Sequence, residues 1–233
     1  LGFFWSFINP LLLLLVYSFV FSVILINRST TQPYAIFLFC GILPWTWFSS
    51  SVLEASNVLI GGGNLIKKVL FPAEVLPIVT VLANMVHFLL GLPILFLFMA
   101  IYGVRPDLPG LVWFPVILLV QLVFTLGLAL IVSSLTVHFR DIKDILGNLM
   151  TFWFFATPII YDMTLFDDKP VGKALINLNP FTHIAISYQE VLFYPGPFGH
   201  WKWLVALGVA SVGVFLLGYF LFDRLRDSFA EAV

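Results

Sequence analysis

Long apolar segments without a charged residue dominate this chain. Residues 1–26 contain no Asp, Glu, Lys or Arg, and the whole sequence is 61% hydrophobic and 10% charged. A soluble globule of 233 residues would need far more polar surface than this composition offers. About 20 apolar residues in a helix cross the roughly 30 Å hydrocarbon core of a bilayer. The sequence therefore predicts an all-α integral membrane protein.

Six segments have a length and hydropathy suited to crossing the bilayer. They are residues 7–26, 34–57, 75–102, 111–137, 145–161 and 201–222, followed by a charged tail from residue 223. The fifth segment, at about 17 residues, is at the short limit for a span. We expect one membrane domain covering residues 1–233 with both termini on one side. Because Leu1 is not a methionine, we also expect further residues before it.

Two charged loops are assigned to the cytoplasmic face. The first, residues 61–77, interrupts the apolar pattern with glycines, prolines, Glu74 and the pair Lys67-Lys68. Paired lysines beside a span favour the cytoplasmic side. The second loop, residues 138–144, lies two spans further on and therefore on the same side. With six Lys and Arg inside against five outside, the tight grouping of the inside charges supports this orientation more than their number does.

A short helix is expected between the fifth and sixth spans. Asn179 followed by Pro180 is typical of a helix start, with a capping side chain and proline at the first helical position. After it, apolar residues recur at helical spacing until Pro195. We expect an amphipathic or re-entrant helix at the outer surface.

Motifs for catalysis, nucleotide binding and metal binding are missing from the sequence. The run Gly61-Gly62-Gly63 does not match a dinucleotide loop, because Ile66 stands where the third glycine is needed. Cys40 is the single cysteine, and the net charge of −1 argues against a nucleic-acid partner. No catalytic or metal-binding residues are therefore assigned.

Polar and aromatic side chains within the spans have two interpretations each. His87, Asn84 and Gly91 form a polar stripe that suits bonding between helices, and Glu54 suits extension toward the membrane surface. Aromatic residues in the first, second and fifth expected spans could serve packing alone or could line a path for sugar rings. These possible channel aromatics are Tyr17, Trp45, Trp47, Phe152, Trp153 and Phe155.

Residues 64–77 resemble the first cytoplasmic loop of the ABC-2 type permeases that export O-antigen polysaccharide, teichoic acid or capsule. Residues 1–10, 139–142, 157–161 and 179–182 resemble further segments of that family in the same order. The resemblance implies a six-span permease that works as a homodimer in the bacterial plasma (inner) membrane with both termini cytoplasmic. Two separate ABC ATPase subunits would bind ATP and Mg, so no cofactor is expected in this chain. The remaining partners implied are membrane lipids and a glycan.

The resemblance also implies roles for particular residues. An ATPase coupling loop would contain Asn64, Leu65, Ile66, Lys67, Lys68, Phe71, Pro72 and Glu74. A second cytoplasmic loop would contain Arg140 and Asp141, and an outer gate region Pro158, Tyr161, Asn179, Pro180 and Tyr188. The implied cargo is a lipid-linked polysaccharide such as O antigen. Teichoic acid, capsule, a small lipid or a drug are alternatives, and a membrane-embedded enzyme modifying lipid or glycan is a remote one.

Overall fold

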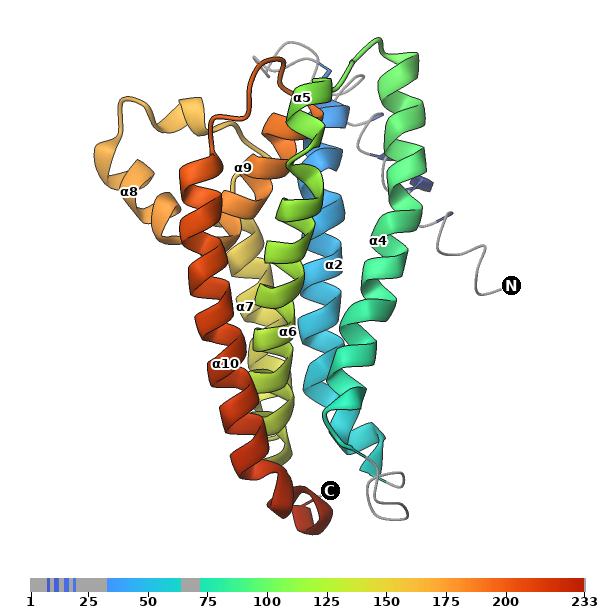
Figure 1. Cartoon of the computed structure of the whole chain (residues 1–233), viewed down its shortest axis with the longest axis vertical. Helices are drawn as coiled ribbons and strands as arrows, with labels where there is room; N and C mark the ends of the chain where they lie inside the picture. The colour runs from blue at the N-terminus through green and yellow to red at the C-terminus, as the bar shows by residue number, and fades with distance from the viewer. Residues whose placement is uncertain are drawn as a thin grey trace. The chain divides into compact units, whose positions relative to one another are not determined.

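The described part of the chain is helical throughout (Figure 1). The computed structural model describes residues 33–63 and 72–232, together with the isolated positions 8, 11, 12, 15, 16 and 19. Within those residues there are helices and turns and no strand, as expected of an all-α protein. The expected first span at residues 7–26 lies largely outside the described residues, and loop residues 64–71 lie wholly outside them.

Four helices are long and apolar enough to cross a membrane. They are α2 (Tyr34–Gly61), α4 (Val75–Ile101), α6 (Phe114–His138), which follows the single turn α5 (Leu108–Leu111), and α10 (Trp201–Ala232). They correspond to the second, third, fourth and sixth expected spans. Pro44 and Pro93 lie inside α2 and α4 without ending them.

The fifth expected span forms a shorter helix than the sequence suggested. Helix α7 (Ile142–Phe155) has 14 residues and ends before the expected limit at Tyr161. At a rise of 1.5 Å per residue it is roughly 21 Å long, less than the hydrocarbon core. Pro158 explains the early end, because proline has no N–H to donate and disfavours a helical Thr157 before it. Tight turns replace the helix there, with the Ile159 N–H donating to the Thr157 carbonyl at 2.7 Å.

The segment between α7 and α10 holds three short helices. They are η2 (Met163–Phe166), α8 (Pro170–Leu178) and α9 (Pro180–Leu192). Helix α9 begins where the sequence predicts, at the cap Asn179. Its expected apolar face is buried, but Thr182, His183, Ser187 and Gln189 are buried as well. Helix α9 is therefore packed on nearly all sides instead of lying with one face open.

Contacts divide the chain into two compact units. Unit 1 contains residues 1–46, 86–117 and 154–204, and unit 2 contains residues 47–85, 118–153 and 205–233. Helices α2, α4, α6 and α10 contribute residues to both. The expectation of one transmembrane domain over residues 1–233 stays a prediction.

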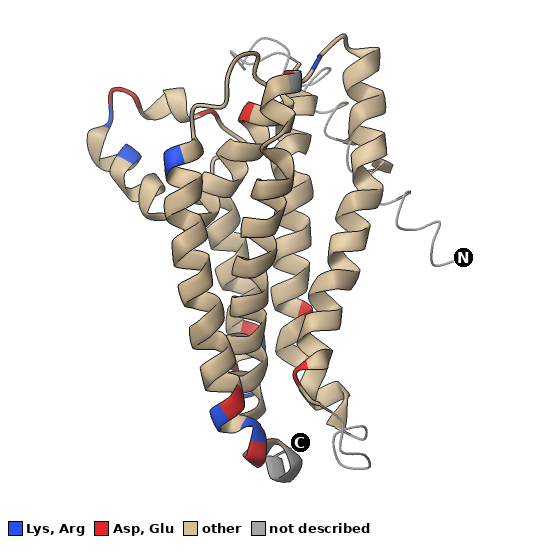
Figure 2. Cartoon of the chain, in the orientation of Figure 1, with Lys and Arg blue, Asp and Glu red and all other residues tan. Residues whose placement is uncertain are grey.

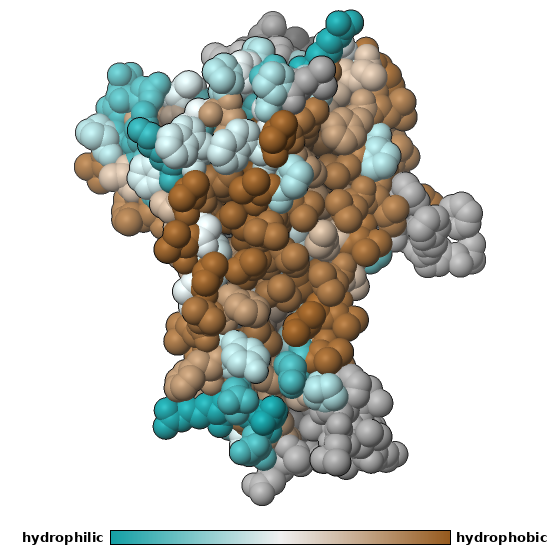
Figure 3. Space-filling view, viewed as in Figure 1, coloured by the Kyte–Doolittle hydropathy of each residue, from teal (hydrophilic) through white to brown (hydrophobic). Residues whose placement is uncertain are grey.

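Surface character changes along the long helices. The exposed middle turns of α4 and α10 are apolar, with Val86, Leu97, Val209 and Leu216 among the exposed side chains (Figure 3). The charged residues of α10 and of the turns lie near helix ends (Figure 2). An apolar outer surface with charges at the ends is what a helix in lipid requires.

Candidate functional site

The expected outer gate region is organised by Asn179 in unit 1. Its side-chain oxygen accepts from the Phe181 N–H at 3.0 Å, which caps α9. Its amide nitrogen donates to the Ala156 carbonyl at 3.2 Å and to the Thr157 hydroxyl at 2.9 Å. One side chain thus starts α9 and ties it to the turn that ends α7. Pro180 occupies the first position of the helix as predicted.

The turn around Pro158 is held from two helices of unit 1. The Gln189 amide on α9 donates to the Pro158 carbonyl at 2.9 Å. On α2, a Cβ at Gly41 would lie 3.1 Å from the Ile159 side chain and 3.4 Å from the Gln189 amide nitrogen. The small residue therefore lets α2 approach both the turn and α9. A larger residue at position 41 would push these segments apart.

Tyr188 and Tyr161 complete the expected gate residues. The Tyr188 ring is fully buried and makes edge contacts with Phe88 and Phe114 at centroid distances of 5.8 and 5.6 Å. Its hydroxyl has no hydrogen-bond partner among the described residues, an arrangement that costs free energy in a packed interior. The half-buried Tyr161 donates to the Phe155 carbonyl at 3.1 Å. The structure thus places Pro158, Asn179 and Tyr188 around α9, and Tyr161 on the turn after α7.

Two of the expected channel aromatics, Trp45 and Trp47, are buried. In unit 1, Trp45 stands edge-on to Phe181 with ring centroids 5.0 Å apart. In unit 2, the Trp47 indole N–H donates to the Val81 carbonyl at 3.1 Å. Both rings are engaged in packing within this chain.

The aromatic residues of α7 differ among themselves. Phe152 and Phe155 are exposed, with Phe152 at 72%. Trp153, in contrast, packs edge-on against Phe48 at 5.2 Å in unit 2. The structure therefore leaves the Phe152 and Phe155 side chains exposed, with Phe155 in edge contact with Phe154, whereas Trp153 is partly covered. Tyr17 lies outside the described residues.

The expected coupling loop is described only at its edge. Residues 64–71 lie outside the described residues, whereas Pro72 is exposed and Glu74 is half-buried. One Glu74 carboxylate oxygen is buried without a hydrogen-bond partner in the described part of the chain. At the other edge, a Cβ at Gly62 would lie 2.8 Å from the Leu76 side chain, so the ends of the loop are held closely together.

A buried cluster in unit 2 supports these loop edges, and we call it the helix-end cluster. It consists of Leu59, Ala73, Leu130, Val137, Phe222 and Phe229. The sequence suggested a charged tail from residue 223, but α10 continues to Ala232 and buries Phe229 completely. Ser228 adds a hydrogen bond, with its hydroxyl 3.0 Å from His138 Nε2. The signal missed in the sequence was the recurrence of Phe222, Leu225 and Phe229 at helical spacing.

The second expected cytoplasmic loop is exposed. Arg140 and Asp141 lie between α6 and α7 and face solvent. The Asp141 carbonyl accepts from the backbone N–H groups of Asp144 and Ile145, which starts α7. None of the ion pairs found within the described residues involves this loop. Its charges are therefore available for a partner.

A polar pair inside the spans was not foreseen. The Asn84 amide on α4 donates to the Glu54 carboxylate on α2 at 2.8 Å, within unit 2. The bond agrees with the expectation that Asn84 serves bonding between helices, and Glu54 stays exposed while it accepts. The two residues lie seven positions before Gly61 and nine after Val75, so their equal depth becomes apparent only once the ends of α2 and α4 are known. In the described part, no three His, Cys, Asp or Glu side chains are placed to hold a metal ion.

These features define a multi-pass helical membrane protein whose polar groups serve packing and helix ends. A family model described as "ABC-2 type transporter" matches residues 1–193. The chain belongs to this ABC-2 type transporter family. It is 38% identical over 233 residues to an O-antigen export system permease protein of Myxococcus xanthus, covering 100% of this chain and 88% of that protein. It is 33% identical over 230 residues to the protein of that name from Klebsiella pneumoniae, covering 99% and 86%.

Proposed function

We propose that this chain is the transmembrane permease of an ATP-driven exporter of lipid-linked O antigen. The similarity over the full chain to O-antigen export permeases, 38% identity over 233 residues, carries this proposal. It extends through the segments expected to form the coupling loop and outer gate. Smaller cargo such as a drug has no comparable observation in its favour.

The proposed assembly contains two copies of the permease and two ABC ATPase subunits in the bacterial inner membrane. Each permease would use six spans, with residues 7–26 and the short α7 added to the four long helices. Helices α8 and α9 would form the outer gate, and both termini would be cytoplasmic. ATP and Mg would bind to the ATPase subunits, so the permease itself is not an enzyme.

Export would be driven by a rigid-body movement. Closure of the ATPase pair on ATP would pull on loop 64–71, which joins α2 to the start of α4. Both helices would shift with it, because small movements at an interface are passed on through packed elements. The glycan would then advance through weak and repeated contacts, since a tightly held polymer could not move on.

The function is tested by deleting the gene in its own cell and labelling surface O antigen with antibody. Loss of surface label, accumulation of lipid-linked polysaccharide inside, and rescue by the wild-type chain are the expected results. Unchanged surface O antigen in the deletion strain would refute the proposal.

The coupling loop is tested by the double replacement Lys67→Glu and Lys68→Glu. Reversing two charges should weaken docking of the ATPase, so export and permease-stimulated ATP hydrolysis should fall while the permease stays folded. The matched control is Arg105→Glu with Lys202→Glu, two exposed cations that belong to the expected outer side and do not line the pocket described below. Normal export and stimulation in the loop variant would exclude the coupling role.

A further inference from the structure

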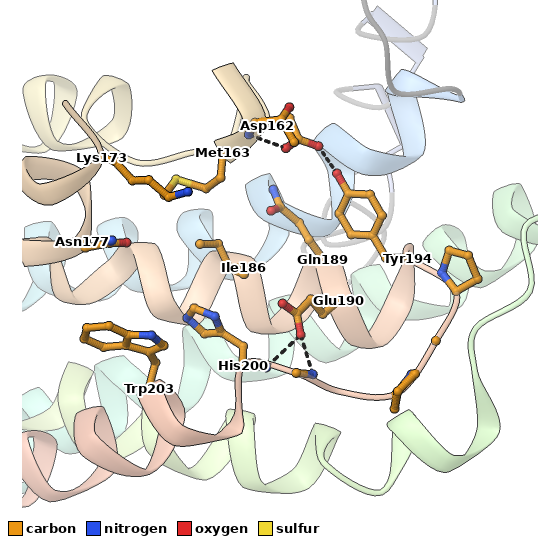
Figure 4. A pocket seen from close by; sticks show the side chains of 15 residues that line it. Asp162, Met163, Lys173, Asn177, Ile186, Gln189, Glu190, Tyr194, His200 and Trp203 are labelled. Carbon is orange, nitrogen blue, oxygen red and sulfur yellow. Dashed lines mark hydrogen bonds between the residues drawn. The ribbon is translucent and has the colours of Figure 1, made fainter. Parts of the chain in front are cut away.

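A pocket of about 550 Å³ opens within unit 1 beside α8 and α9 (Figure 4). The segment that follows α9 and leads into α10 closes its other side. Its lining includes Asp162, Lys173, Asn177, Glu190, His200 and Trp203. The volume falls within the range of small-molecule sites. Helices α8 and α9, proposed above to form the outer gate, line it through Lys173, Asn177 and Glu190, but Pro158, Tyr161, Asn179, Pro180 and Tyr188 do not.

A stack of rings holds one wall of the pocket in place. The Trp203 indole lies nearly parallel to the His183 ring, with centroids 4.6 Å apart and planes 7° apart. His183 Nδ1 lies 2.9 Å from His200 Nε2, and its Nε2 lies 3.0 Å from the Asn177 carbonyl. Trp203 is nonetheless 50% exposed as a residue and lines the pocket. The result is a flat aromatic surface that is fixed from behind and open in front.

Polar side chains around this surface are also held in position. One Glu190 oxygen accepts from the backbone N–H groups of Gly199 and His200, both at 3.0 Å. Asp162 accepts from the Tyr194 hydroxyl and, at 2.9 Å, from the Thr164 N–H. These bonds orient two carboxylates at the pocket.

Unlike the Asp162 and Glu190 carboxylates, the Asn177 side-chain amide makes no hydrogen bond among the described residues; only its backbone carbonyl does. It lines the pocket and offers both a donor and an acceptor. Unused planar amides and oriented carboxylates are groups that can bind vicinal hydroxyls.

The charges at the pocket disfavour an anion. Asp162 and Glu190 are acidic, and Lys173 is paired with Asp167 at 2.7 Å. Burial, with a smaller effect of His183, lowers the pKa of His200 to about 4, so this ring is neutral at physiological pH. Burial lowers the pKa of His183 as well. A phosphate or uronic acid would therefore meet two carboxylates and no unpaired cation.

We propose that this pocket is a binding site for a neutral or amino sugar of the exported polysaccharide. The sugar would lay its C–H face on Trp203, and its hydroxyls would bond Asn177 and Glu190. This inference rests on the proposed function, because it takes the cargo to be a glycan and the α8–α9 segment to face the exit side. An open site of this kind would hold the emerging chain briefly without trapping it.

The test uses the permease–ATPase complex in nanodiscs. The probe is the lipid-free O polysaccharide released by mild acid from the producing cells. Saturation-transfer NMR should detect binding to the wild-type complex, and Trp203→Ala should weaken it by up to about tenfold, because an aromatic contact of about 1.4 kcal/mol corresponds to that factor. The matched control is Trp201→Ala, a 43% exposed tryptophan two positions away that does not line the pocket.

A second variant tests the pocket without disturbing the stack of Trp203 on His183. Asn177→Ala deletes only a half-buried amide that has no hydrogen bond among the described residues, and it should also weaken binding, with unchanged elution of the complex. Equal binding by wild type and both pocket variants would overturn the proposal, and so would displacement of the probe by inorganic phosphate. If the wild-type complex does not bind the probe although the gene deletion abolishes surface O antigen, the pocket proposal alone is rejected. If the deletion leaves surface O antigen unchanged, the proposed function is rejected.

Discussion

Two glycines allow α6 and α10 to approach closely in unit 2. A Cβ at Gly218 on α10 would lie 2.4 Å from the Gly127 carbonyl oxygen on α6. In the opposite direction, a Cβ at Gly127 would lie 2.7 Å from the Phe215 backbone nitrogen. Backbone atoms cannot step aside as the end of a side chain can. Small residues are what allow membrane helices to pack at such distances.

Replacing Gly218 with alanine should therefore force α6 and α10 apart. Overpacking of this kind costs roughly 1–3 kcal/mol, so the melting temperature of the detergent-solubilised permease should fall. Gly213→Ala is the matched control on the same helix, because its Cβ would meet nothing within 4 Å. Greater helix propensity should leave that variant as stable as wild type or slightly more so. Equal melting temperatures for the two variants would contradict the close contact.

His200 gives unit 1 a dependence on pH. Its pKa is about 4 in the fold against an ordinary value of 6.5, because burial and the neighbouring His183 disfavour the charged ring. Between these values the unfolded chain binds more protons than the folded one, so the free energy of unfolding rises with pH. This contribution is complete above about pH 6.5 and is lost as the pH falls toward 4.

Thermal unfolding between pH 7.5 and pH 4.5 measures this effect. The wild-type melting temperature should fall with acidity, and His200→Gln should show a smaller fall because glutamine does not titrate. Glu190, Asp162 and His183 remain in both proteins and provide the common background. An unchanged pH dependence in His200→Gln would show that His200 contributes nothing to it.

Single residues also show what the sequence could and could not predict. Asn179 was predictable as a cap because the cap and the following proline are local features. The bond between Glu54 and Asn84 was not, because it depends on how far along α2 and α4 each residue lies. The stack of His183 on Trp203 was likewise hidden, since it joins separate helices across an irregular segment.

At the scale of helices, the apolar segments predicted α2, α4, α6 and α10 well, because uninterrupted hydropathy and length determine a span. Boundaries that depend on a turn were less predictable. Helix α7 stops before Pro158, although the surrounding residues are apolar enough to continue it. Helix α8, starting at Pro170, was missed because its 9 residues are fewer than the roughly 11–18 over which helical periodicity is recognised, although its two sides differ in polarity.

The last turns of α10 have a role that the expected charged tail did not suggest. Phe229 is fully buried in the helix-end cluster beside Leu59 and Ala73, which lie on the two sides of loop 64–71. Its ring contacts Phe222 edge-on at 5.2 Å. The end of α10 thus supports the helix ends from which the proposed coupling loop emerges.

Phe229→Ala should weaken that support. Removing a buried phenylalanine costs about 3–5 kcal/mol, so both the melting temperature and the ATP hydrolysis stimulated by the permease should fall. Phe220→Ala is the control on the same helix, because Phe220 is 59% exposed. Measuring ATP hydrolysis in reconstituted complexes, at a temperature where both variants are folded, separates an effect on coupling from an effect on stability. Full stimulation in Phe229→Ala under those conditions would restrict its role to stability.

At the scale of the whole molecule, the described helices expose two kinds of surface. The exposed positions of α10 between Val205 and Phe220 are almost all apolar, as a lipid-facing helix requires. Helix α7 instead exposes Asn148 and Thr151 together with Phe152. The Asn148 side chain has no hydrogen bond among the described residues. Lipid cannot satisfy that amide, so this mixed face of α7 fits a second copy of the chain or a path for cargo better than lipid.

Cysteine cross-linking in native membranes tests this assignment to the proposed homodimer. Cys40 is the only cysteine and is buried, so an introduced thiol reacts against a low background. In a two-fold symmetric dimer, residues near the axis face their own copies and can form a disulfide at Cα separations below about 7 Å. Oxidation should therefore produce a covalent dimer with cysteine at one or more of Asn148, Thr151 and Phe152, and none with Val209→Cys on the exposed face of α10. If Val209→Cys forms the covalent dimer and the α7 variants do not, the dimer contact is assigned to α10. The polar face of α7 would then be assigned to the cargo path.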